Sequence, residues 1–176
     1  MHGLLWRVMK PWKKAERKPR IGAREERAAN SITGVPEEEI KRIKLMLQSP
    51  DRHTRTRGKV ELNRLRTGNA MHRLDSPNAE DRITAMRELL KLGASEKTRL
   101  NIVSAMANTI GRELDLETTR EMLINLREYL HETNNIDYKT KNTVISNLEK
   151  VVLGEGDEKI KSSAQKMIIW IQKKYE

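Results

Sequence analysis

The sequence predicts an all-α protein: a short right-handed array of antiparallel helix pairs, about three and a half repeats long, with a basic N-terminal arm. Two observations support this. The 176 residues include no Phe and only 3% aromatic residues, so any core must consist of Leu, Ile, Val, Met and Ala, a composition that suits helices. Signals for helix starts also recur along the chain at a nearly constant spacing.

The helix-start signals are capping residues, prolines and acidic residues in a first turn. Those that open each pair lie 41, 39 and 41 residues apart, at Pro36, Pro77, Leu116 and Asp157. Signals for the second helices lie between them, at residues 49–51, 95–96 and 135–137. The pattern predicts a chain of helix pairs.

Apolar residues recur in register with this spacing. One column consists of Ile43, Ile83, Leu123 and Ala164, and a second column of Met46, Met86, Leu126 and Met167. Spacings of three, four and seven place such residues on one face of each helix. The register fails at Pro50, which falls in a third apolar column, and at Asn147, which lies where other pairs have Leu65 and Met106.

With this period and two helices per unit, residues 36–176 resemble a small HEAT-like α-solenoid. Residues 74–93 are most similar to a family unit. A serine and a proline precede the first helix of this segment, Arg82 lies within that helix, and a Leu-Leu pair precedes the turn. The resemblance implies a binding scaffold without naming a ligand. An irregular helical bundle is the alternative arrangement.

The net charge of +10 is unevenly distributed. Residues 1–74 carry a net charge of +11, whereas residues 75–176 carry −1. Because prolines and glycines interrupt residues 1–35 and no apolar period is sustained there, we expect an extended or partly disordered arm over this range. Residues 36–176 then form the helical-repeat domain.

The second helix of the first pair is the most basic one. It carries six cations against Glu61, and the next pair has no cation at the equivalent positions. We therefore expect the fold not to need these cations, and a polyanionic partner to be the reason for them. They are Arg52, Arg55, Arg57, Lys59, Arg64 and Arg66.

The arm supplies further candidate residues for nucleic-acid binding. Its cations are Arg7, Lys10, Lys13, Lys14, Arg17, Lys18, Arg20, Arg24 and Arg27. Trp6 and Trp12 are candidates for base stacking or for docking to a partner protein. Such a basic arm is similar in layout to the arms of ribosomal and ribosome-associated proteins.

These features predict a cytoplasmic, non-enzymatic protein that binds nucleic acid, with RNA slightly favoured over DNA. Because no sequence-reading motif is present, contacts are expected mainly with the backbone and shape of the nucleic acid. The alternative is a protein-binding scaffold, with its partner on residues 75–176. The amphipathic segment 1–14 would then dock to a partner protein or a membrane surface.

Membrane binding and organelle import are less favoured. Pro11 limits a helix at the N-terminus to about two turns, too short for strong membrane binding. An Arg-rich, acid-poor start would suit a transit peptide, although Glu16, Glu25 and Glu26 argue against a long one. No apolar run approaches the roughly 18 residues that a membrane span requires.

Catalysis, cofactors and metals are not expected. The chain has no cysteine, and its four histidines lack the spacing of metal ligands. Gly58-Lys59 lacks both the earlier glycine and the following Ser or Thr of a phosphate-binding loop. HEAT-like DNA glycosylases would need an aromatic-rich cleft with a catalytic carboxylate, and the few aromatic residues make such a cleft improbable.

Overall fold

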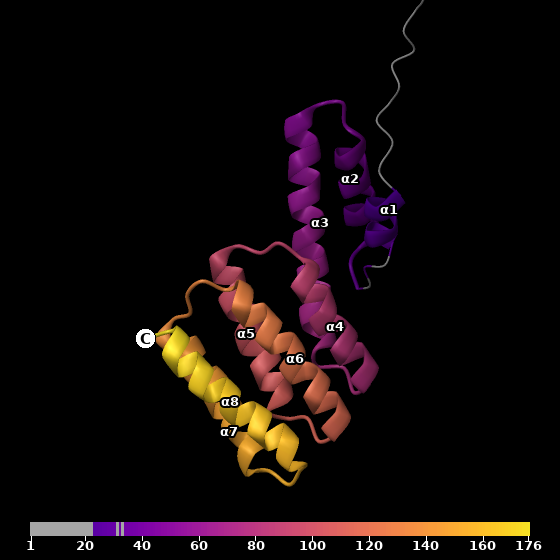
Figure 1. The fold of residues 1–176 in the computed structure, drawn as a ribbon. Coiled ribbons are helices and arrows are strands. Elements are labelled where there is room, and N and C mark those ends of the chain that lie inside the picture. Colours follow the sequence, from indigo (N-terminus) through magenta and orange to yellow (C-terminus); the bar gives the residue numbers. More distant parts are fainter. Residues whose placement is uncertain (1–22, 31, 33) are drawn as a thin grey trace, which may run out of the picture.

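The computed structural model describes residues 23–30, 32 and 34–176, and this part of the chain is built from α-helices and connecting loops, without strands (Figure 1). The all-α class is therefore confirmed. The helices are α1 (Ala23–Asn30), α2 (Glu37–Gln48), α3 (Arg52–Arg73), α4 (Ala79–Lys91), α5 (Glu96–Ile110), α6 (Leu116–Glu132), α7 (Tyr138–Leu153) and α8 (Glu158–Lys174).

The helix starts coincide with the predicted signals. The residues that precede α2 to α8 are, in order, Pro36, Asp51, Asn78, Ser95, Asp115, Asp137 and Asp157. At α3, the Asp51 carboxylate accepts hydrogen bonds of 2.7 Å from both the backbone N–H and the hydroxyl of Thr54. These bonds favour the ionised form and lower the pKa of Asp51.

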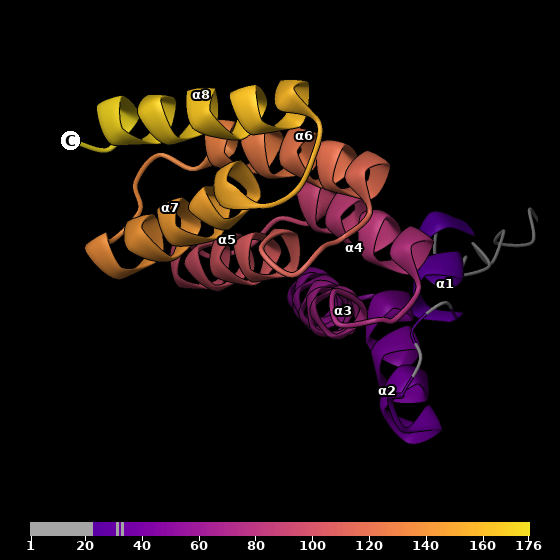
Figure 2. The same ribbon diagram turned by 90° about the horizontal axis from the view of Figure 1, so that it is seen from below.

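The helices α4 to α8 form two layers (Figure 2). One layer contains α4, α6 and α8, and the other contains α5 and α7; α5 packs on α6, and α7 packs on α8. Among the described helices, the backbones of α4 and α5 approach each other less closely than those of α5 and α6, and the backbones of α6 and α7 less closely than those of α7 and α8. The helices that pack as consecutive pairs are thus α3 with α4, α5 with α6 and α7 with α8. Apart from α2 with α3, the pairing is shifted by one helix from the expected one.

Two hydrophobic cores lie along the molecule, and α3 contributes to both. Leu62, near its middle, is buried with Ala29, Ile43 and Leu47 in a small core between α1, α2 and α3. Ala70 of α3 and Leu74 just beyond its end belong to a much larger core that continues through α8. In Figure 1, α1 and α2 accordingly lie beside the first part of α3, away from α5 to α8.

The expected arm of residues 1–35 needs a correction. Residues 23–30 form the helix α1, and the side chain of Ala29 is 1% exposed against α2 and α3. Burial of this small apolar face stabilises the helix. In the sequence the face is hard to recognise, because charged residues surround it. The expectation for residues 1–22 lies outside the described residues.

A glycine brings α2 and α3 together. A Cβ atom on Gly58 would lie 3.0 Å from the Cβ of Met46 and 3.2 Å from the backbone nitrogen of Leu47. Because glycine has no Cβ atom, the two backbones can approach closely here. This contact is the reason for a residue of low helix propensity inside α3.

Both breaks in the apolar register have a structural reason. Pro50 falls in the third column because α2 ends at Gln48, one turn earlier than the later helices of its column. Asn147 of α7 is buried and donates hydrogen bonds of 2.9 Å to the side-chain oxygen of Asn108 and to the carbonyl of Thr143. Gly111, at the end of α5, leaves the space that Asn147 occupies.

Substituting Gly111 by alanine should destabilise the protein by about 1–3 kcal/mol, because the new Cβ would lie 2.1 Å from the Asn147 Oδ1 atom. Urea denaturation measures this effect. In an Asn147→Ala background the same substitution should cost much less, since the two closest atoms, Oδ1 and Cγ, are gone and only the Cβ at 3.0 Å remains. Equal costs in the two backgrounds would contradict this account of the contact.

A buried ion pair joins α4 to the turn between α5 and α6. The guanidinium of Arg82 binds the carboxylate of Glu113, and their side chains are only 15% and 6% exposed. Arg82 also donates to the carbonyls of Ser76 and Pro77, at 2.8 and 2.9 Å. The second carboxylate oxygen of Glu113 accepts from the backbone N–H groups of Leu114 and Asp115. This cluster fixes the α5–α6 turn against the start of α4.

Glu113→Ala should lower the free energy of unfolding by about 3 kcal/mol, because it leaves the Arg82 charge buried without its partner. The matched control is Glu121→Ala, which breaks the Arg87–Glu121 pair, whose side chains are 48% and 41% exposed. That change should cost less than about 1 kcal/mol. Denaturant titrations of both variants test the difference, and similar losses would refute it.

Candidate nucleic-acid interface

Arg55 is used by the fold. Its Nη1 atom donates to the carbonyls of Ser49 and Pro50, at 2.8 and 2.6 Å. Arg82 makes the same pair of bonds to Ser76 and Pro77. Both belong to a local pattern, Ser-Pro, then Asp or Asn as the cap, then Arg four residues later. This repeated pattern marks Arg55 as part of a helix start, and it is visible in the sequence.

Arg66 is also used by the fold. Its Nε and Nη2 atoms donate to one carboxylate oxygen of Glu88 in α4, at 3.2 and 3.0 Å, and Arg73 donates to the other at 3.3 Å. All three side chains are mostly buried. The expectation that the fold does not need the α3 cations is therefore wrong for Arg55 and Arg66.

Lys59 and Arg64 are exposed and make surface ion pairs. The Nζ atom of Lys59 lies 4.0 Å from the Glu25 carboxylate of α1, and Arg64 lies 2.9 Å from Glu61 and 3.3 Å from Glu39. Because the cation of each pair is 63–64% exposed, these pairs contribute little to stability and weaken with salt. Both cations can therefore exchange these carboxylates for phosphates at small cost.

Arg52 and Arg57 are exposed, and neither makes an ion pair or a side-chain hydrogen bond with any residue that the structure describes. Together with Lys59 and Arg64, they lie on the first two-thirds of α3. We call these four residues together the α3 basic face. At a hundred degrees per residue, Arg52 and Lys59 lie on one side of the helix, about 140° around it from Arg57 and Arg64. Arg57 and Arg64 are seven residues apart, which places them on one side of the helix about 10 Å from each other.

The arm residues are only partly described. Arg27 lies exposed on α1, beside the N-terminal half of α3. The helix α1 also includes Arg24, whose side chain is outside the described part. The predicted nucleic-acid contacts of residues 7–20, and of Trp6 and Trp12, lie outside the described residues.

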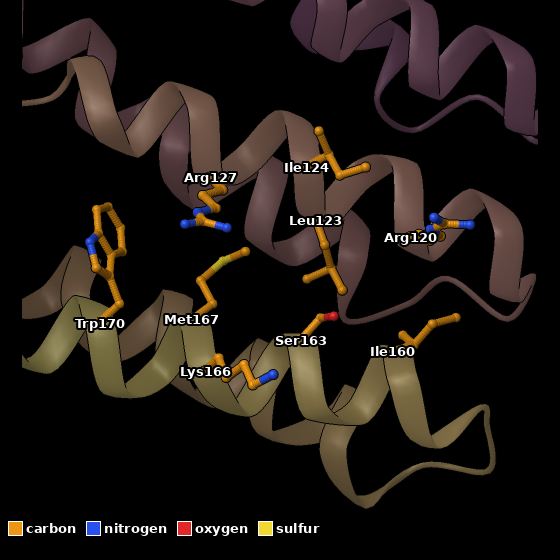
Figure 3. A pocket seen from close by; sticks show the side chains of 9 residues that line it. All are labelled: Arg120, Leu123, Ile124, Arg127, Ile160, Ser163, Lys166, Met167 and Trp170. Atoms are coloured by element: carbon orange, nitrogen blue, oxygen red, sulfur yellow. The ribbon is translucent and has the colours of Figure 1, made fainter.

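A second basic surface lies in the C-terminal part of the molecule. A cavity of about 460 Å³ separates α6 from α8, with Arg120, Arg127 and Lys166 at its edges (Figure 3). Leu123, Ile124, Ile160, Met167, Ser163 and Trp170 complete its lining. We call it the α6/α8 groove. The groove could not be predicted from the net charge of −1 over residues 75–176, because that sum combines its cations with acidic residues elsewhere in this range.

Neither a metal-binding cluster nor a membrane-spanning helix is present among the described residues. No group of three or more His, Asp or Glu side chains there is arranged to hold a metal ion. No helix in this part of the chain has both the length and the apolar character that crossing a membrane requires. In comparisons with protein families and with curated proteins, the chain matches no family model and no curated relative.

Proposed function

We propose that this protein binds nucleic acid without catalysing a reaction on it, with RNA slightly ahead of DNA. Its setting would be the cytoplasm, with a ribonucleoprotein such as the ribosome as one context. In this proposal the helices stack as a small HEAT-like array, in which the two layers of α4 to α8 are the repeating part. The α3 basic face and the basic arm contact the phosphate backbone.

The supporting observation is the division of the α3 cations. Arg55 and Arg66 are held by carbonyls and by Glu88, whereas the four residues of the α3 basic face point to solvent with weak partners or none among the described residues. Four exposed cations on one helix repel each other, and phosphates opposite them would relieve that repulsion. Neutralising phosphates also releases bound counterions, which favours association.

The place of this face in the fold supports the same proposal. The first part of α3 is fixed by the small core of Ala29, Ile43, Leu47 and Leu62, and it projects beyond the large core (Figure 1). A helix that exposes cations on two sides can lie against a nucleic-acid backbone without a cleft. The contacts would then read charge and shape rather than base sequence.

Replacing Arg52, Arg57, Lys59 and Arg64 with Gln should weaken binding of fluorescein-labelled RNA and single-stranded DNA oligonucleotides, measured by fluorescence anisotropy. The slope of log affinity against log salt should decrease by roughly 0.7 for each phosphate that the variant no longer neutralises. Helical content, measured by circular dichroism, should be unchanged because these side chains make no buried contact.

The matched control replaces four exposed lysines outside both basic surfaces with Gln: Lys91, Lys97, Lys139 and Lys173. This variant has the same net charge as the first and should keep most of the affinity. Equal loss in both variants would indicate a general charge effect, and a flat salt dependence of the unmodified protein would overturn the proposal itself.

A protein-binding scaffold is the second candidate function. The α6/α8 groove favours it, because this groove combines apolar side chains with cations and lies far along the chain from the α3 basic face. The two functions are compatible, since they use different surfaces.

A further inference from the structure

The groove between α6 and α8 differs from the equivalent contact between α4 and α6. There, Arg87 of α4 forms a 2.6 Å ion pair with Glu121 of α6. The repeat register aligns Arg87 with Arg127, by the shift of 40 that aligns Ile83 with Leu123. It aligns Glu121 with Ser162, by the shift of 41 that aligns Leu123 with Ala164. The cation is therefore kept in α6, but its acidic partner in α8 is replaced by serine.

The other cations of the groove are likewise without acidic partners. None of Arg120, Arg127 and Lys166 makes an ion pair or a side-chain hydrogen bond with the described residues, and no acidic residue lines the cavity. Figure 3 shows Arg127 reaching from α6 into the space above Met167 of α8. The charged groups of these three residues therefore have no carboxylate opposite them across the cavity.

The surface between these cations is apolar. Leu123, Ile160 and Met167 form its floor, and Ile124 beside them is 50% exposed. An exposed isoleucine next to an apolar cavity gains free energy when another apolar side chain covers it. A ligand of the groove therefore needs apolar groups as well as negative charge.

We propose that the α6/α8 groove binds an acidic amphipathic segment of a partner protein. Its Asp or Glu side chains pair with Arg120, Arg127 and Lys166, and its large apolar side chains fill the cavity between them. Arg120 and Arg127 are seven residues apart on α6, about 10 Å along the helix axis. That distance matches carboxylates two turns apart in a helical segment lying along the groove.

Contacts beyond Trp170 hold the end of α8 on the end of α6. The Tyr175 hydroxyl donates to the carbonyls of Leu130 and Thr133, at 2.7 and 3.0 Å, and the Lys174 ammonium donates to the same two carbonyls. These bonds satisfy carbonyls at the end of α6 and fix Trp170 beside them. The site is thus formed before a ligand arrives, which lowers the entropy cost of binding.

Charge and surface chemistry argue against the other occupants. The chain's own N-terminal segment is rich in cations and would be repelled by the groove, as would a second copy with its net charge of +10. A nucleic acid offers phosphates but no apolar side chain for the floor. The Trp170 ring, the aromatic side chain of the groove on which a base could stack, already packs against His131, with 4.7 Å between the ring centroids. The Lys174 ammonium lies 5.1 Å from the Trp170 ring centroid.

The test uses the full chain and synthetic fluorescein-labelled peptides, with binding measured by fluorescence anisotropy. The probe is a glutamate-rich helical peptide with leucines every three or four residues. One comparison peptide has serine in place of the leucines, and another has lysine in place of the glutamates. Only the probe with both features should bind well. Equal binding of the serine peptide would reduce the site to nonspecific charge attraction and overturn the proposal.

Variants locate the binding. Arg127→Gln should weaken binding of the probe roughly three- to tenfold. Ser162→Glu should weaken it to a similar extent, because the new carboxylate would stand where the register places the Glu121 partner of Arg87 and would compete for Arg127. The matched control Arg87→Gln, which alters the closed α4/α6 contact, should leave the affinity unchanged. The proposal is overturned if Arg127→Gln and Arg87→Gln have equal effects, or if an oligouridine displaces the peptide from the groove.

This inference does not depend on nucleic-acid binding by α3. The substitutions on the α3 basic face should leave peptide binding within about twofold, since no residue of that face lines the groove. Conversely, Arg127→Gln should leave RNA binding nearly unchanged. Each proposal can thus fail while the other holds.

Discussion

The fold depends on ion pairs that neutralise charged side chains where helices meet. Charged residues make up 34% of the chain, so almost every contact between helices has to accommodate some of them. Glu88 of α4 holds Arg66 and Arg73 of α3, and Arg82 is held by Glu113. Because removing one partner of a buried pair costs more than the pair contributes, each contact requires both of its members. The cations that no such contact uses are the ones that we propose for binding.

The same need for charge neutralisation explains why two surfaces remain basic. On α3, the cations that point toward α4 or toward the preceding turn bind carboxylates or backbone carbonyls there, whereas the four cations of the α3 basic face are exposed, and only Lys59 and Arg64 among them pair with carboxylates. Between α6 and α8, a serine stands where an acidic residue closes the neighbouring contact. One surface has charge without apolar area, and the other has both. This chemical difference is the reason why we propose a different class of partner for each surface.

The features that depend on local interactions were the predictable ones. At the starts of α3 to α8 a capping side chain accepts from an N–H group within one turn, and α2 starts at Pro36 with acidic residues in its first turn. Because these signals are local, they were confirmed. The roles of individual cations were not predictable, because Arg66 meets a carboxylate 22 residues away and its alignment with neutral residues in the next pair concealed this. The helix α1 and the shifted pairing depend on tertiary packing, which apolar periodicity does not encode.

The two cores joined through α3 have a consequence for how the molecule opens. The core shared by α1, α2 and the first part of α3 buries few apolar side chains, whereas the larger core runs from Ala70 to Ile171. Free energies of local opening follow the apolar area buried, so the two ends form cooperative units of unequal stability. Backbone amides in α1 and α2 will exchange with solvent faster than those in α5. A polyanion bound to α3 would then act on the weaker unit, and it would raise that unit's stability by mass action without altering the rest.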